Sequence, residues 1–278
     1  MIIAKNTYQL RQVLSGQSKI GFVPTMGALH EGHLSLVQEA LNMGCYTVTS
    51  IFVNPTQFNN SSDYEQYPET LDQDLKKLEE TGCDVVFVPS VDEVYKGRKE
   101  SAEYKHQFGY IETVLEGAFR PGHFEGVAQV VHILFELVRP DIAFFGEKDF
   151  QQLSIIRALV KKLKWPIEIV GKPTVREADG LALSSRNLRL TSVMRNEATV
   201  LYKALTMAKQ SYGQRSNAQI NRDVSQLVEA SALELEYFEI IAPDSFKKVD
   251  NYQPGHSAQA VIAAYAGEVR LIDNLKLA

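Results

Sequence analysis

Short apolar runs alternate with amphipathic stretches along the first two thirds of this chain. We expect strands at five apolar runs, 20–24, 47–53, 84–89, 142–145 and 167–170. We expect helices at four stretches with helical spacing of apolar residues, 34–43, 68–81, 126–138 and 150–164. Continuous apolar strands are typical of sheets covered on both faces. The alternation therefore predicts an α/β fold whose parallel sheet is built by right-handed crossovers.

The expected helix over 68–81 carries local signals of its own. Pro68 suits a first helical turn, where its missing N–H costs nothing. We place Asp72, Asp74 and Lys76 on the polar side of this helix.

The pattern changes after about residue 175. Polar, irregular sequence is followed by expected helices over 192–212 and 218–232 and expected strands over 236–241 and 258–265. We therefore predict two domains, a larger α/β domain over 1–175 and a smaller α+β domain over 176–278.

Composition excludes several classes of protein. The 278 residues are 45% hydrophobic and carry a net charge of −5 with no basic block, which disfavours a nucleic-acid partner. No apolar run approaches the roughly 18 residues that span a bilayer, and the first residues lack a signal-peptide pattern. The two cysteines, Cys45 and Cys83, are expected to be buried, reduced thiols. We expect a cytoplasmic protein with no membrane partner.

The segment 24–33, Pro-Thr-Met-Gly-Ala-Leu-His-Glu-Gly-His, joins the first of these strands to its helix. Such a junction favours phosphate, because backbone N–H groups and the helix dipole both point at the ligand. Gly27 allows a tight turn, and His30 and His33, three residues apart, share a helix face. Two imidazoles there suit a polyphosphate. An ordinary helix start with two surface histidines is the alternative for this segment alone. A zinc site is disfavoured, since no third ligand is near.

Two further strand ends carry polar side chains. Asn54 and Gln57 lie in 52–58 and offer amide groups for a substrate with hydroxyls and a carboxylate, although an Asn-Pro turn also explains the segment. The polar stretch 59–63 is a candidate flap.

The segment 144–152 repeats the strand–turn–helix pattern. Gly146 supplies the turn, Lys148 is a cation suited to phosphate, and Asp149 is a candidate helix cap. Gln152 lies in the first turn of the expected helix.

Two loops leave alternatives open. Ser184, Ser185 and Arg186 could clamp phosphates or belong to an interdomain linker. The segment 120–124, Arg-Pro-Gly-His-Phe, either supplies a further cation or only forms a turn.

Five motifs in order resemble the pantoate–β-alanine ligase family. They are Pro-Thr-Met-Gly-Ala-Leu-His-Glu-Gly-His at 24–33, Phe-Val-Asn-Pro-x-Gln-Phe at 52–58, Gly-Glu-Lys-Asp at 146–149, Gln-Gln-Leu at 151–153 and Asp-Gly-Leu-Ala-x-Ser-Ser-Arg-Asn at 179–187. The resemblance implies a Rossmann-like domain with an H-x-G-H signature, a C-terminal lid domain and a cytoplasmic homodimer. Asn59-Asn60, Leu183 and Glu125 depart from the family's pattern, but none of them holds a role in the chemistry.

The resemblance also implies roles for individual residues. His30, His33, Lys148 and Arg186 are the implied catalytic residues, with His33 as proton donor. Gln57 and Gln152 are implied to hold pantoate, with β-alanine near Gln57, and Tyr67 belongs to the same pocket. ATP is implied to contact Met26, Gly27, Ala28, Leu29, His30, Glu31, Gly32, His33, Gly146, Glu147, Lys148, Asp149, Val175, Leu183, Ser184, Ser185 and Arg186. Mg²⁺ is expected on the phosphates, with no metal site of the protein's own.

The motifs together predict polyphosphate binding beside amide recognition of a small polar acid. The resemblance implies an ATP-dependent ligase that forms an acyl adenylate from pantoate and passes the acyl group to β-alanine. A nucleotidyltransferase is the rival enzyme, but it would need cations for a phosphate acceptor where this chain has amides. A silent nucleotide sensor is the rival from another class. It is disfavoured because His33, Lys148 and Arg186 are all present.

Overall fold

The computed structural model describes residues 1–59 and 61–278. Asn60, in the candidate flap, lies outside the described residues. The chain divides into two compact units, Met1–Pro173 and Thr174–Ala278, with the boundary two residues before the expected one. In the described part of the chain, no helix is long and apolar enough to cross a membrane.

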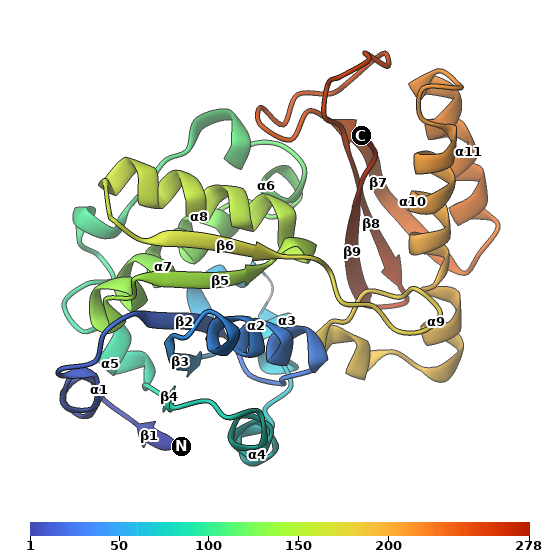
Figure 1. Ribbon diagram of the computed structural model, residues 1–278. Coiled ribbons are helices and arrows are strands. Elements are labelled where there is room, and N and C mark those ends of the chain that lie inside the picture. Colours follow the sequence, from blue (N-terminus) through green and yellow to red (C-terminus); the bar gives the residue numbers. More distant parts are fainter. Residues whose placement is uncertain (60) are drawn as a thin grey trace. The chain divides into compact units, whose positions relative to one another are not determined.

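The first unit is built on a six-stranded parallel sheet in the order β1-β4-β3-β2-β5-β6 (Figure 1). Its strands are β1 (Ile2–Ala4), β2 (Ile20–Thr25), β3 (Tyr46–Ile51), β4 (Val85–Phe87), β5 (Ile142–Gly146) and β6 (Glu168–Lys172). Its helices of eight or more residues are α1 (Thr7–Leu14), α2 (Glu31–Asn42), α4 (Leu71–Thr81), α7 (His123–Val138) and α8 (Phe150–Leu163). Shorter helices are α3 (Ser61–Glu65), α5 (Val91–Tyr95) and α6 (Glu116–Phe119). The predicted α/β class is confirmed.

Two apolar layers cover the sheet. Alternate strand residues point to opposite faces, so Phe22 packs with α1, α7 and α8 while its neighbour Val23 packs with α2 and α4. The predicted thiols, Cys45 and Cys83, are free and buried. These layers hold the strand ends in fixed positions, and the candidate site is built there.

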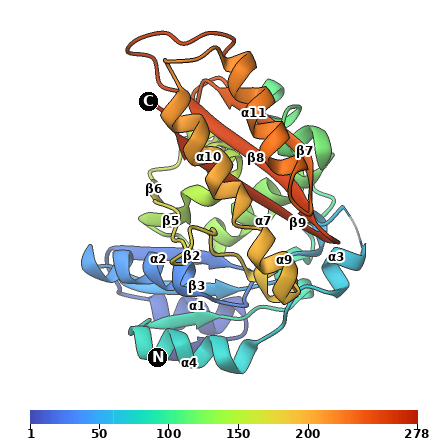
Figure 2. The ribbon, with the colours of Figure 1, turned by 90° about the vertical axis from the view of Figure 1, so that its right-hand side faces the viewer.

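The second unit packs three helices with an antiparallel sheet in the order β7-β8-β9 (Figure 2). The elements are α9 (Ser192–Glu197), α10 (Val200–Ser211), α11 (Asn217–Glu229), β7 (Leu233–Ile241), β8 (Gln259–Ala266) and β9 (Val269–Lys276). The predicted α+β character is confirmed, and β9 is a strand that the pattern did not show.

Two local predictions were wrong. The helix expected from Pro68 begins at Leu71, and Asp74, expected on its polar side, is fully buried. The single helix expected over 192–212 is two helices. Its break falls at Thr199, whose Oγ1 donates to Asn196 O at 2.8 Å. A hydroxyl bonded to a nearby carbonyl offers the backbone an alternative to the helical ladder.

Candidate active site

The carboxyl ends of the three strands that lead into the motifs lie side by side at one end of the sheet. Strands β3, β2 and β5 are neighbours, and the chain reverses its direction of sheet building between β2 and β5. Such a switch point is where open α/β sheets bind ligands. We call the segments that follow these strands the histidine turn (26–33), the amide turn (52–58) and the lysine turn (146–149).

The histidine turn has an unusual backbone that side chains of α4 hold in place. Gly27 and Ala28 both have positive φ, 82° and 48°. The Asp74 carboxylate accepts hydrogen bonds from the backbone N–H groups of Ala28 and Leu29, each at 2.8 Å, and Lys77 Nζ donates to Leu29 O at 2.5 Å. A buried carboxylate is stable only when its oxygens are bonded, and here Thr70 Oγ1 donates to Asp74 as well. The predicted tight turn at Gly27 is confirmed.

The two histidines cap the helix that follows. His30 is the N-cap of α2, and its Nδ1 accepts from Gly32 N at 3.1 Å, while His33 Nδ1 accepts from His30 N at 3.3 Å. The ring centroids are 4.1 Å apart, as expected for a shared face. Since each Nδ1 is an acceptor, the proton of each neutral ring must sit on Nε2. Both rings therefore retain an Nε2–H donor for a ligand.

The surroundings keep both imidazoles neutral at physiological pH. Burial and the nearby Lys148 cation lower the pKa of His30 to about 4. Burial and the adjacent His30 lower the pKa of His33 well below its usual range. At neutral pH the turn thus presents two uncharged N–H donors, and the cationic groups beside them are Lys148 and Lys77.

The amide turn is joined to the histidine turn. Gln57 Nε2 lies 3.0 Å from Met26 Sδ, and Asn54 Nδ2 donates to Gln57 Oε1 at 3.0 Å. Tyr95 OH donates to Asn54 Oδ1 at 2.5 Å. Burial raises the pKa of Tyr95 to about 12, so its hydroxyl keeps the proton that it donates. Asn54 is buried, caps the Asn-Pro turn by accepting from Thr56 N, and also bonds the Gln57 side chain. Tyr67, implied to belong to the same pocket, is buried against Phe58 of this turn, with ring centroids 5.8 Å apart.

The lysine turn is simpler. Gly146 has φ −78° and ψ 136°, a conformation open to any residue, so the turn does not depend on glycine. Asp149 makes no side-chain cap bond to α8, and its Oδ1 lies 3.5 Å from Lys148 Nζ. Gln152 is half-buried in the first turn of α8. Its neighbour Gln151 is buried and bonds the backbone at Ile111, Val114 and Glu116, a purely structural role.

In the second unit, the predicted nucleotide residues share one loop. Leu183 N donates to Val175 O at 3.0 Å, so these two positions lie side by side. Ser184 caps a short 3₁₀ helix, η5 (Ser185–Arg189), by accepting from Arg186 N. The loop is held by Arg176. Its guanidinium bonds both Asp273 oxygens, at 2.6 and 2.9 Å, and stacks on Tyr202. Arg176 and Asp273 carried no sequence signal because they are 97 residues apart.

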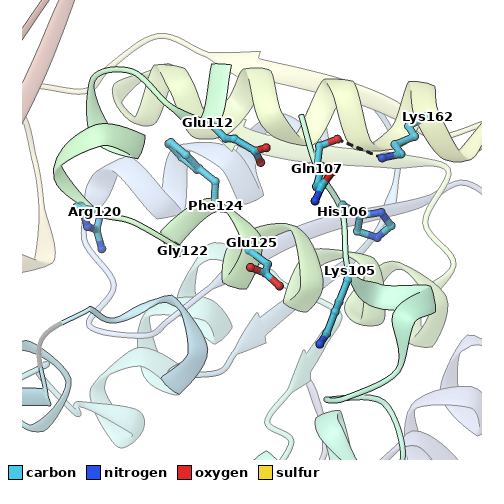
Figure 3. Close-up of a pocket in the computed structure, with 9 residues that line it drawn as sticks. All are labelled: Lys105, His106, Gln107, Glu112, Arg120, Gly122, Phe124, Glu125 and Lys162. Atoms are coloured by element: carbon cyan, nitrogen blue, oxygen red, sulfur yellow. Dashed lines mark hydrogen bonds between the residues drawn. The ribbon is translucent and has the colours of Figure 1, made fainter. Parts of the chain in front are cut away.

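The described residues hold no metal cluster, and the pocket in Figure 3 is lined by residues other than those assigned to ATP or pantoate. Among residues 1–59 and 61–278, no group of three or more His, Cys, Asp or Glu side chains is placed to hold a metal ion. The pocket has a volume of about 420 Å³. It is lined by Lys105, His106, Gln107, Glu112, Arg120, Gly122, Phe124, Glu125 and Lys162. Arg120, Gly122 and Phe124 belong to the segment for which a further cation or a turn was left open, and none of the lining residues was assigned to ATP or pantoate.

The fold and the three turns define an α/β protein whose polar turns gather at the switch point of a parallel sheet, the place where such sheets bind small molecules. The model of the pantoate–β-alanine ligase family matches residues 2–276, and the chain belongs to this family. The family predicted from the five motifs is thereby confirmed.

Relatives agree along nearly their whole length. Pantothenate synthetase of Bacteroides fragilis is 47% identical over 266 residues, which cover 95% of this chain and 93% of the relative. That of Christiangramia forsetii is 48% identical over 270 residues, with 96% and 95% covered.

Solved structures show the same fold. Pantothenate synthetase from Thermus thermophilus superposes with a TM-score of 0.92 at 42% identity, covering 100% of this chain and 99% of that one. Pantoate–β-alanine ligase from Francisella tularensis, described as complexed with β-γ ATP and β-alanine, gives a TM-score of 0.82 at 37% identity, with 100% and 98% covered.

Proposed function

We propose that this protein is a ligase that uses ATP to join pantoate to β-alanine, giving pantothenate, AMP and pyrophosphate. Membership in the family supports the ligase and disfavours the rival nucleotidyltransferase and nucleotide sensor. One observation carries the proposal furthest: Gln57 of the amide turn contacts Met26 of the histidine turn. An amide group suited to an acid thus adjoins a turn suited to phosphate.

In the first step, a pantoate carboxylate oxygen attacks the α-phosphorus of ATP, and pyrophosphate leaves as pantoyl adenylate forms. The neutral His30 and His33 act as Nε2–H donors to phosphate oxygens. Burial and the adjacent His30 lower the pKa of His33, which favours a neutral ring, so we assign it hydrogen bonding to the phosphates in place of the implied proton donation. Lys148 and Arg186 stabilise charge on the transferring phosphate, which spreads in the transition state.

In the second step, the neutral amine of β-alanine attacks the acyl carbon of the adenylate. The amide bond forms, the bond to AMP breaks, and the amine loses a proton to solvent. The protein needs no covalent nucleophile because the adenylate is already activated. Its contribution is to position the reactants.

The remaining assignments are part of the same proposal. Gln57 and Gln152 hold pantoate, and the residues assigned to ATP are those of the histidine turn, the lysine turn, Val175 and residues 183–186. The donor set of these turns, imidazoles, amides and cations, suits phosphates better than a bare divalent cation, so Mg²⁺ is carried by the phosphates. The family resemblance supports a homodimer, and the buried free thiols fit a reducing compartment such as the cytoplasm.

Calorimetry on Gln57→Ala and Gln152→Ala tests the proposal. Each variant should weaken pantoate binding about 5- to 150-fold, because a buried polar group loses its partner, which costs about 1–3 kcal/mol. ATP affinity should change less than about twofold, within the usual effect of a neutral surface change. Gln38→Ala, on an exposed position of α2, is the control. Equal losses for ATP and pantoate would refute a separate acid site.

A further inference from the structure

The segment between α6 and α7 is more than a turn. Its sequence left open whether it supplies a cation or only reverses the chain. In the structure it leads into α7 and directs Arg120 and His123 at the amide turn. His123 is buried. Arg120 is half-buried and lies at one end of the pocket in Figure 3, away from Lys162.

Both side chains meet at one backbone oxygen. His123 Nδ1 lies 2.8 Å from Gln57 O, and Arg120 Nη2 donates to the same oxygen at 3.4 Å. Arg120 Nη1 lies 3.2 Å from His123 Nε2. A carbonyl oxygen only accepts, so Nδ1 must carry a proton. A guanidinium only donates, so Nε2 must offer its lone pair. The three groups therefore fix His123 as the neutral Nδ1–H tautomer.

Helix α7 also sets the distance to this turn. A Cβ on Gly126 would lie 2.4 Å from Thr56 O, so only glycine allows the helix to approach the backbone this closely. Asn54 Nδ2, which donates to Gln57 Oε1, also donates to Gly126 O at 3.3 Å. Next to this contact, Asn59 Nδ2 donates to Pro121 O. The main chain of Gln57 is thus bonded from α7, and its side chain is bonded by Asn54 and Met26.

We propose that Arg120 and His123 are positioning residues for the acid substrate, and that they act by holding the Gln57 carbonyl. This inference rests on the proposed role of Gln57 in binding pantoate. Arg120 is itself anchored, 3.8 Å from the Glu116 carboxylate. A residue whose backbone is fixed loses little further freedom when its side chain takes up a ligand, and pre-organisation of this kind raises affinity.

A double-mutant cycle tests the coupling, with the KM for pantoate and kcat measured at saturating ATP. His123→Phe keeps a ring but removes both nitrogens, and it should raise the KM for pantoate about tenfold, the loss of roughly one hydrogen bond. ATP affinity by calorimetry should stay within about twofold. His123→Asn should recover most of the loss, because its amide N–H can reach the Gln57 oxygen. In a Gln57→Ala background, His123→Phe should add less than about twofold, because the residue through which it acts is already lost.

Arg120→Met keeps the aliphatic stem and repeats the test without altering the buried ring. It covers the case in which His123→Phe fails to fold, as shown by thermal unfolding. A full tenfold effect of His123→Phe or Arg120→Met in the Gln57→Ala background would overturn the inference while leaving the role of Gln57 intact. An unchanged KM for pantoate in Gln57→Ala itself would instead overturn the proposed acid site, and the inference with it.

Discussion

The histidine turn and the lysine turn occupy equivalent places, each after a central strand and before a helix, yet they are built differently. In the histidine turn, two successive residues have positive φ, and the buried Asp74 carboxylate bonds the backbone N–H groups. In the lysine turn, Gly146 has an ordinary conformation, and the distinctive feature is the Lys148 ammonium group beside Asp149.

The histidine turn depends on the shape of its backbone, and the lysine turn depends on the charge of one side chain. The histidine turn has to be held in a backbone conformation that few residues adopt, so its shape depends on the hydrogen bonds that side chains of α4 make to it. The lysine turn follows a strand that the core already fixes in place, so its contribution to binding phosphate lies in one side chain. Substitutions in or around the histidine turn should therefore lower the free energy of unfolding. Substitutions in the lysine turn should lower the rate of adenylate formation.

Removing the Asp74 carboxylate should have the largest effect on stability. Asp74→Ala leaves the N–H groups of Ala28 and Leu29 without their carboxylate. Because each buried group that loses its partner costs about 1–3 kcal/mol, we expect a loss of about 2–6 kcal/mol in the free energy of unfolding. Urea unfolding measures it. Asp72→Ala, two residues earlier on the same helix and exposed, is the control and should change stability by less than about 0.5 kcal/mol. Equal effects of the two variants would show that the hydrogen bonds of Asp74 do not stabilise the histidine turn.

Removing the charge should leave the fold intact. Lys148→Ala, and likewise Arg186→Ala, should slow adenylate formation by about 10²–10³-fold, comparable to losing one oxyanion donor. The free energy of unfolding should stay within about 0.5 kcal/mol. Rapid-quench measurement of each half-reaction is the assay, and Lys161→Ala, exposed on α8, is the control. A variant that forms the adenylate normally and is slow only in amide formation would contradict the assigned role.

The two glycines give a matched pair. Gly27→Ala places a Cβ on a residue with φ 82°, 3.2 Å from Asp74 Oδ2 and from Ile51 Cγ2, and should cost about 1–3 kcal/mol. Gly146→Ala meets no atom within 4 Å and should be neutral or stabilising by up to about 1 kcal/mol. Thermal unfolding compares them. Similar losses at both positions would mean that the two turns are equally constrained.

Acid should weaken the histidine turn by a smaller amount. His30 in the folded protein has its pKa lowered to about 4, whereas the unfolded chain takes up a proton near 6.5. Its contribution to stability is therefore present above pH 6.5 and is lost as the pH falls from 6.5 towards 4. Between pH 7 and 5 the loss should be about 1–2 kcal/mol. His30→Asn keeps an N-cap acceptor but cannot titrate, so it should show a shallower pH dependence in urea unfolding. An identical slope would contradict the buried neutral imidazole.

The sequence was sufficient for what is local or periodic. Five strands of the parallel sheet, the H-x-G-H turn and the family follow from apolar runs and contiguous motifs, whereas β1, only three residues long, was not predicted. It was not sufficient where a side chain acts across the fold. Asp74 has the spacing of a solvent-facing residue, and its burial follows only from the distant backbone N–H groups that it bonds. The roles of Tyr95 and His123 at the amide turn have the same origin, since their partners are 41 and 66 residues away.

Exchange of labelled pyrophosphate into ATP tests the central claim, that an acid site and a phosphate turn adjoin so that pantoate is adenylated before β-alanine reacts. We predict exchange when pantoate and Mg²⁺ are present and β-alanine is absent, and loss of that exchange in Lys148→Ala. Exchange that is as fast without pantoate, or that requires β-alanine, would contradict it.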